Sequence, residues 1–238
     1  MPKTHLVCHR GANKIAPENT YSAAEGAIAY GASFIEVDVR MSADGVLYIL
    51  HDETVDRTTN GTGAIEAMTS TDLDALDAGS WFGPEFAGQR LPKFDEYLGW
   101  LRGKCGIYIE IKKAPVEAVR DLVHKHGFAD GSYYFSFDED IAKELIRVAP
   151  DFPVMALHRL TGDMQAIVDH GYRIIEFLPD EITPENLQQA RSLGLWIQVF
   201  HPEDDAEVFR AMIDAGIDYA NIDHPESFNR VRRAMESV

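Results

Sequence analysis

The chain has 238 residues, of which 45% are hydrophobic and 26% are charged. This composition is typical of a globular protein with a sizeable core. Its 39 acidic residues outnumber the 22 basic ones and give a formal net charge of −17, which argues against nucleic acids and anionic membrane surfaces as partners. A small phosphate ester held by a local basic pocket stays compatible with this charge.

Short apolar runs such as "HLVCH", "SFIEVDV" and "GIYIEI" recur along the chain and are bounded by turn residues. Runs of this length and composition are typical of buried strands. The pattern predicts nine strands, over residues 5–9, 33–39, 46–50, 106–111, 132–136, 153–157, 172–176, 195–200 and 218–222.

Segments with helical periodicity separate most of these strands. Thr183 precedes Pro184 and Glu185, which is a common arrangement at the start of a helix. The predicted helices cover about 19–30, 70–77, 93–102, 115–126, 138–148, 162–170, 184–193, 203–215 and 225–236.

This alternation of strands and helices predicts an α/β fold with a parallel sheet, and its repetition favours a closed (β/α)8 TIM barrel. The surplus strand is explained by the turn signal at 43–45, which predicts a hairpin over 37–51 that rises above the barrel mouth. Residues 52–92 are rich in Gly, Thr and Pro and are interpreted as a small insertion over the C-terminal mouth. We expect residues 1–238 to form a single domain.

Cys8 and Cys105 are the only cysteines, and neither belongs to a CxxC pair, which argues against a zinc site or a disulfide framework. The first residues, "MPKTHLVCHR", lack the apolar stretch of a signal peptide. No run approaches the roughly 18 apolar residues of a membrane-spanning helix. The sequence therefore predicts a cytoplasmic protein without stable membrane association, and it leaves the oligomeric state open.

Polar residues recur at the C-terminal ends of the predicted strands, where barrels of this kind carry their catalytic groups. Because such residues are costly to bury without a purpose, their repetition predicts an active site at this end of the barrel. The set comprises His9, Arg10, Glu36, Asp38, His51, Asp52, Glu110, Lys112, Ser136, Glu176 and Asp223.

Glu36 and Asp38 are two residues apart, so in a strand both point to the same face. Together with Glu110 they would repel one another unless a cation lies between them. Oxygen ligands of this kind favour Mg²⁺ or Ca²⁺. The alternative is a structural network with Arg10 and Lys112, but two histidines at neighbouring strand ends favour the metal.

His9 and His51 are the candidates for proton transfer, because imidazole titrates near neutral pH. One histidine of a pair can accept a proton while the other donates one. His158, His201 and His224 also lie near strand ends and are weaker candidates.

Arg10 and Lys112 would place positive charge beside the carboxylates, where arginine suits bidentate phosphate binding and lysine a point contact. Ion pairing with those carboxylates is the alternative, and both can hold at once. In "APENT", Glu18 is a candidate substrate contact because it lies close to His9. Asn19 reads either as a helix N-cap or as a substrate contact.

The motifs "HRG", "PENT", "EVDV", "DGVLYILHD", "IEIK", the "SF" at 136–137 and "NIDHPE" follow one another in order between residue 7 and about residue 226. In this order they resemble the glycerophosphodiester phosphodiesterase family. The resemblance implies a (β/α)8 barrel with a small insertion and a divalent metal, Mg²⁺ or Ca²⁺. It also implies hydrolysis of a small glycerophosphodiester to glycerol 3-phosphate and an alcohol.

The resemblance further implies roles for residues of this chain. The metal ligands would be Glu36, Asp38 and Glu110, the acid–base pair would be His9 and His51, and the phosphate would lie against Arg10 and Lys112. From their positions in this sequence we also expect Glu18, Ser136 and Phe200 to lie near the substrate.

The chain departs from the family at one late strand, where members usually carry a Trp-Thr-Val-Asn-like stretch. Here "LWIQVFHPEDD" offers Phe200 at the tryptophan position, and Trp196 lies earlier. This predicts a different wall for the glycerol or alcohol group.

Two alternative functions remain, a phospholipase D-like hydrolase of lysophospholipids and a barrel that binds phosphodiesters without cleaving them. The head group, the attacking oxygen and the division of work between the histidines also stay open.

Overall fold

The computed structural model describes residues 4–236 and contains all nine predicted strands, each within two residues of its predicted ends. Their bounds are β1 His5–Cys8, β2 Phe34–Met41, β3 Leu47–Ile49, β4 Gly106–Lys113, β5 Ser132–Phe135, β6 Met155–Leu157, β7 Ile174–Phe177, β8 Trp196–His201 and β9 Tyr219–Ile222.

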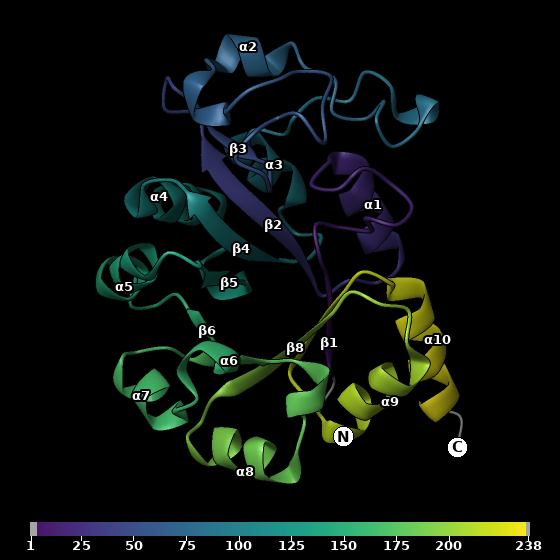
Figure 1. Cartoon of the computed structure of the whole chain (residues 1–238), viewed down its shortest axis with the longest axis vertical. Helices are drawn as coiled ribbons and strands as arrows, with labels where there is room; N and C mark the ends of the chain where they lie inside the picture. The colour runs from purple at the N-terminus through teal and green to yellow at the C-terminus, as the bar shows by residue number, and fades with distance from the viewer. Residues whose placement is uncertain (1–3, 237–238) are drawn as a thin grey trace.

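Eight of these strands run parallel in the order β5–β4–β2–β1–β9–β8–β7–β6. A parallel bridge between Tyr134 and Val154 brings the two ends of this sheet together. Helices surround the strands on the outside (Figure 1). The predicted (β/α)8 barrel is therefore confirmed, with β1 held between β2 and β9.

The hairpin predicted over 37–51 is formed by β2 and β3, which pair in antiparallel fashion with Val39 opposite Ile49. Gly45 closes its turn with a φ of 85°, a conformation that favours glycine. The segment that follows lies beyond the hairpin, at the top of Figure 1. Its buried side chains pack with the hairpin in a small cluster of their own, which comprises Tyr48, Leu50, Val55, Ile65, Leu73, Ala78 and Leu91.

The helices follow the prediction, but between β6 and β7 a short helix that was not predicted precedes the one predicted over 162–170. Gly162, with a φ of 62°, ends the first, and the side chain of Asp163 caps the second. The predicted helix over 70–77 is also shorter. The bounds are α1 Tyr21–Ala29, α2 Ser70–Asp74, α3 Phe94–Leu101, α4 Val116–His126, α5 Glu139–Val148, α6 His158–Thr161, α7 Met164–Asp169, α8 Pro184–Ser192, α9 Ala206–Ala215 and α10 Pro225–Glu236.

The main core lies between the strands and the surrounding helices, and Leu6 of β1 belongs to it with none of its surface exposed. We expect Leu6→Ala to lower the free energy of unfolding by about 2–5 kcal/mol, because the change leaves a cavity that the packed sheet cannot fill. Urea denaturation followed by circular dichroism would measure this loss. Leu160→Ala is the matched control, because Leu160 is 69% exposed and its truncation should change stability by less than about 0.5 kcal/mol. Equal effects of both changes would contradict the prediction.

Candidate active site

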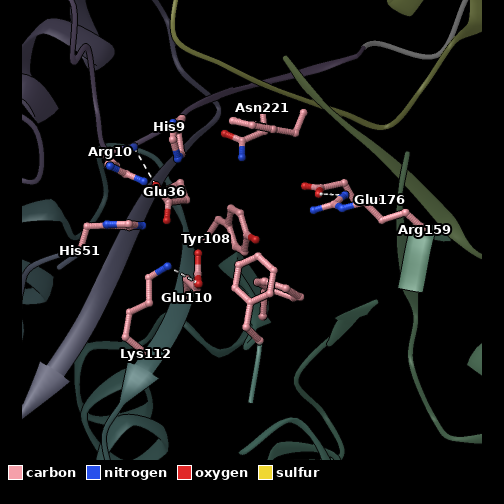
Figure 2. Close-up of a pocket in the computed structure, with 13 residues that line it drawn as sticks. His9, Arg10, Glu36, His51, Tyr108, Glu110, Lys112, Arg159, Glu176 and Asn221 are labelled. Atoms are coloured by element: carbon pink, nitrogen blue, oxygen red, sulfur yellow. Dashed lines mark hydrogen bonds and ion pairs between the residues drawn. The ribbon is translucent and has the colours of Figure 1, made fainter. Parts of the chain in front are cut away.

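A pocket of about 230 Å³ opens at the C-terminal ends of the strands, and most of the predicted site residues line it (Figure 2). The charged and aromatic side chains of several strands converge there, as the sequence pattern predicts for a barrel. The lining residues are His9, Arg10, Glu36, His51, Tyr108, Glu110, Lys112, Phe135, Phe137, Arg159, Glu176, Phe200 and Asn221.

Three carboxylates lie together at one side of the pocket, and two of them, Glu36 and Glu110, line it. Glu36 and Asp38 come from β2, and Glu110 comes from β4, where it lies opposite Asp38 in the sheet. Each residue offers one oxygen, and these oxygens lie within 4.8 Å of one another. All three side chains are buried, so little water reaches them to screen their mutual repulsion.

Arg10 and Lys112 contact the carboxylates directly. Lys112 Nζ lies 3.3 Å from Asp38 Oδ1 and also pairs with Glu110. The backbone N–H of Arg10 donates to Glu36 Oε2 at 2.7 Å, and its Nε lies 3.4 Å from Asp38 Oδ2. The ion pairs that the sequence left as an alternative to phosphate binding are therefore present.

These surroundings shift the pKa values of the three carboxyl groups in different directions. Burial, reinforced by Asp38, raises the pKa of Glu36 well above its ordinary value and that of Glu110 to about 7. Burial acts on Asp38 as well, but Lys112 and Arg10 lower the pKa of Asp38 below its usual range. Glu36 and Glu110 thus lack enough positive charge nearby to stabilise their ionised forms.

The carboxylates fit a divalent metal ion, because their oxygens lie close together and are incompletely hydrogen-bonded. Among the described residues, Glu36 Oε1 is buried and has no hydrogen-bond donor, and Asp38 Oδ1 has only the ion pair with Lys112. Such a buried oxygen is costly unless a further group occupies the space beside it. An all-oxygen set suits a hard cation such as Mg²⁺ or Ca²⁺. The three residues could hold such an ion alongside the cationic side chains.

The turn after β1 explains the "HRG" sequence. Arg10 and Gly11 both have left-handed backbones, with φ of 55° and 81°. A side chain at Gly11 would bring a Cβ within 2.7 Å of Ala23, so only glycine fits. The unusual conformation of Arg10 points its N–H at Glu36 and is held by Asn19, whose N–H donates to the Arg10 carbonyl.

His9 lies at the end of β1 and faces the carboxylates across the top of the pocket (Figure 2). Its Nδ1 lies 2.8 Å from Asp223 Oδ1 at the end of β9. Asp223 also contacts Lys14 at 2.9 Å and the amide of Asn13 at 2.8 Å. Because Asp223 engages Nδ1, it fixes the orientation of the ring and leaves Nε2 as the nitrogen available to the pocket.

His51 is held in the same way at the end of the hairpin. Its Nδ1 lies 2.7 Å from Asp52 Oδ1, and Asp52 is paired in turn with Arg57. Burial lowers the pKa of His51, although Asp38 and Asp52 oppose this effect. The site thus contains two imidazoles beside one carboxylate cluster, each oriented by its own aspartate.

Glu18 and Ser136 lie outside the pocket wall, unlike the other predicted substrate contacts. Glu18 accepts hydrogen bonds from Arg10 at 3.0 Å and from Arg57 at 2.8 Å. It therefore positions the arginine rather than facing the pocket itself. Ser136 donates to the carbonyl of Ile111 at 2.7 Å and lines a neighbouring hollow under α5.

Asn19 is not the N-cap of α1, because Thr20 has that position. Instead the Asn19 amide donates to Asp38 Oδ2 at 2.8 Å, from a backbone with a φ of 58°.

Arg57, which links Glu18 to Asp52, was missed by the sequence reasoning because it lies in an irregular segment. No side chain between 52 and 92 lines the pocket, so this segment borders the mouth through Arg57 rather than roofing it.

Phe200 of β8 also lines the pocket. The ring of Phe200 contacts His9 edge-on, with 4.9 Å between ring centroids. Trp196 begins the same strand and is 45% exposed at its far end. Phe200 therefore occupies the wall position, and Trp196 faces elsewhere.

The described helices include none that is long and apolar enough to cross a membrane.

Known proteins with similar sequences and structures point to one family. A glycerophosphodiester phosphodiesterase of Caldanaerobacter subterraneus is 33% identical over 242 residues, which cover 97% of this chain and 99% of that protein. The crystal structure of a glycerophosphodiester phosphodiesterase from Agrobacterium tumefaciens matches with a TM-score of 0.93 and 43% identity, covering 96% of this chain and 100% of that one. A phosphodiesterase from Oleispira antarctica, solved in complex with the product sn-glycerol-3-phosphate, shares the fold with a TM-score of 0.88 at 22% identity, over 96% of each chain. The model of the glycerophosphoryl diester phosphodiesterase family matches residues 9–227, and the chain belongs to this family of hydrolases.

Proposed function

We propose that this protein hydrolyses soluble glycerophosphodiesters to glycerol 3-phosphate and an alcohol, with the help of a divalent metal ion and two histidines. The observation that carries the proposal is the presence of two histidines, His9 and His51, beside one buried carboxylate cluster, with each imidazole oriented by an aspartate. The Oleispira antarctica protein was solved with glycerol 3-phosphate, which is the product expected of this reaction.

The phosphate would lie between the carboxylate cluster and the cationic side chains. Glu36, Asp38 and Glu110 would hold the metal ion, Mg²⁺ or Ca²⁺. When bound, such an ion supplies positive charge to the non-bridging phosphate oxygens. Arg10 and Lys112, which already lie beside the carboxylates, would donate hydrogen bonds to the same oxygens as negative charge develops on them.

The two histidines would divide the proton transfers. One accepts the proton of the attacking oxygen, and the other protonates the leaving alcohol as the P–O bond breaks. Attack by water gives glycerol 3-phosphate directly, whereas attack by the glycerol 2-hydroxyl first gives a cyclic phosphate that water then opens to glycerol 3-phosphate. Asp223 and Asp52 act as positioning residues, because each holds Nδ1 and turns Nε2 toward the substrate.

The same observations favour an enzyme over a barrel that only binds phosphodiesters. Binding requires cations and a pocket, but it does not require two imidazoles that are held in place by separate carboxylates. The strong negative charge of the chain favours soluble diesters in the cytoplasm over lysophospholipids in an anionic membrane.

A small panel of glycerophosphodiesters tests the proposal. We expect glycerol 3-phosphate release that EDTA reduces to background and that Mg²⁺ or Ca²⁺ restores, because the oxygens of the cluster need a hard cation. Release would be measured with a coupled glycerol 3-phosphate dehydrogenase assay. Release of free choline from lysophosphatidylcholine vesicles, without release of glycerol 3-phosphate from the soluble diesters, would favour the phospholipase D-like alternative. No release from any diester with either metal would refute the proposed reaction.

A further inference from the structure

The pocket has a second polar wall opposite the carboxylate cluster. Figure 2 shows Arg159 and Glu176 across the pocket from Glu110, with Asn221 between them and His9. Arg159 comes from α6, Glu176 from β7 and Asn221 from β9. The mechanism proposed above uses none of these three residues, which we call the far wall.

Asn221 has an unmet hydrogen-bonding need. Its side chain is buried, with 3% of the residue exposed, and within residues 4–236 its Oδ1 has no donor. A buried carbonyl oxygen without a donor is destabilising, so native structures normally provide it with a partner. Since Asn221 lines the pocket, its amide is a hydrogen-bonding group that a bound molecule meets.

Arg159 and Glu176 form an ion pair that presents donors rather than negative charge. Arg159 Nη1 donates to Glu176 Oε1 at 3.2 Å, and Gln198 Nε2 donates to Glu176 Oε2 at 2.8 Å. Glu176 thus has a partner on each oxygen and keeps 7% of its side chain exposed, against 33% for Arg159. The guanidinium is therefore the charged group of the far wall that a ligand meets.

We propose that the far wall selects glycerophosphodiesters whose alcohol group is a polyol, such as a glycerol, inositol or sugar unit, over those with a cationic alcohol such as choline. This inference deepens the proposed function and rests on it. A hydroxyl group can both donate and accept, so it matches the Asn221 amide as well as the Arg159 guanidinium.

A quaternary ammonium group matches neither residue. It can neither donate a hydrogen bond to the Asn221 amide nor accept one from it, and it would bring a second positive charge toward Arg159. The rings of Tyr108, Phe135 and Phe137 in the same pocket would suit either kind of group, since aromatic faces bind both cations and the C–H faces of sugars. The discrimination therefore depends on the polar residues.

The test compares kcat/KM for glycerophosphoinositol and glycerophosphocholine in the wild type, Asn221→Leu and Arg159→Met. The wild type should prefer the inositol diester by about 10-fold or more, and each variant should lose about 10-fold on that diester, mainly through KM, because one hydrogen bond is lost. Activity on the choline diester should change by less than about 2-fold. Arg120→Met is the matched control, because Arg120 has a similar exposed fraction and one carboxylate partner outside the pocket, and it should leave both substrates unchanged.

Two results would overturn the inference. The first is a wild type that prefers the choline diester, and the second is an equal loss of kcat/KM on both substrates in the variants. Either result would show that the far wall does not discriminate between alcohol groups. Hydrolysis of both diesters in these cases would leave the proposed function intact. Hydrolysis of neither diester by the wild type would refute the proposed function, and the inference would fall with it.

Discussion

Replacing His9 or His51 with alanine is expected to lower kcat by about 10²–10⁴-fold, because each change removes one of the two proton-transfer groups. Each ring lies at the pocket wall with its Nδ1 on an aspartate, so each loss removes a positioned Nε2. The measurement is steady-state hydrolysis of the best diester of the panel at saturating metal ion. The KM should change less than kcat, since the phosphate contacts of Arg10 and Lys112 remain.

His5→Ala is the matched control for these variants. His5 lies four residues before His9, at the opposite and exposed end of the same strand, and its removal should leave kcat unchanged. Full activity in both single histidine variants, with metal present, would rule out the proposed acid–base mechanism. A loss in only one of them would restrict the role to that histidine.

Replacing Glu36 with glutamine should lower activity by about 10³-fold, because it removes one of the charged oxygens proposed to hold the metal ion, and such an ion contributes several kcal/mol of charge stabilisation. The same change should not destabilise the metal-free protein. Burial beside Asp38 and Glu110 already raises the pKa of Glu36 well above its ordinary value, so the charged form is unfavourable in the fold and its removal relieves repulsion.

Two readouts separate this prediction from a purely structural role. Isothermal titration should show metal binding to the wild type and a strongly reduced affinity in Glu36→Gln, while thermal denaturation without metal should give an equal or higher Tm for the variant. Glu66→Gln is the control, since Glu66 pairs with Arg40 and Lys113 outside the pocket. If Glu36→Gln bound metal as tightly as the wild type, the carboxylate cluster would be a structural ion-pair network.

The strands and the carboxylate cluster could be predicted because both depend on local patterns. Apolar runs bounded by turn residues mark buried strands wherever they occur, and two acidic residues at a spacing of two must share a face of the strand. The parallel order of the barrel then brings Glu36, Asp38 and Glu110 together without further information from the sequence.

The rest of the site depends on contacts between distant segments. Ser136 and Glu18 have the expected chemistry, but each is bound by a group of the protein itself. Ser136 donates to a backbone carbonyl, and Glu18 accepts from Arg10. Arg159 lies on a four-residue helix that no periodicity reveals. Asn221 lies within a strand that reads as apolar, and only the packing of the barrel shows that its amide faces the pocket.

The position of β1 between β2 and β9 has a consequence for the newly synthesised protein. His9 leaves the ribosome well before Asp223, which orients it and lies 214 residues later. Until β9 emerges, β1 has an unpaired edge and the imidazole lacks the carboxylate that holds its ring. The enzyme therefore acquires its activity only after nearly the whole barrel has been made. Nascent chains from which β9 has not yet emerged should have no activity.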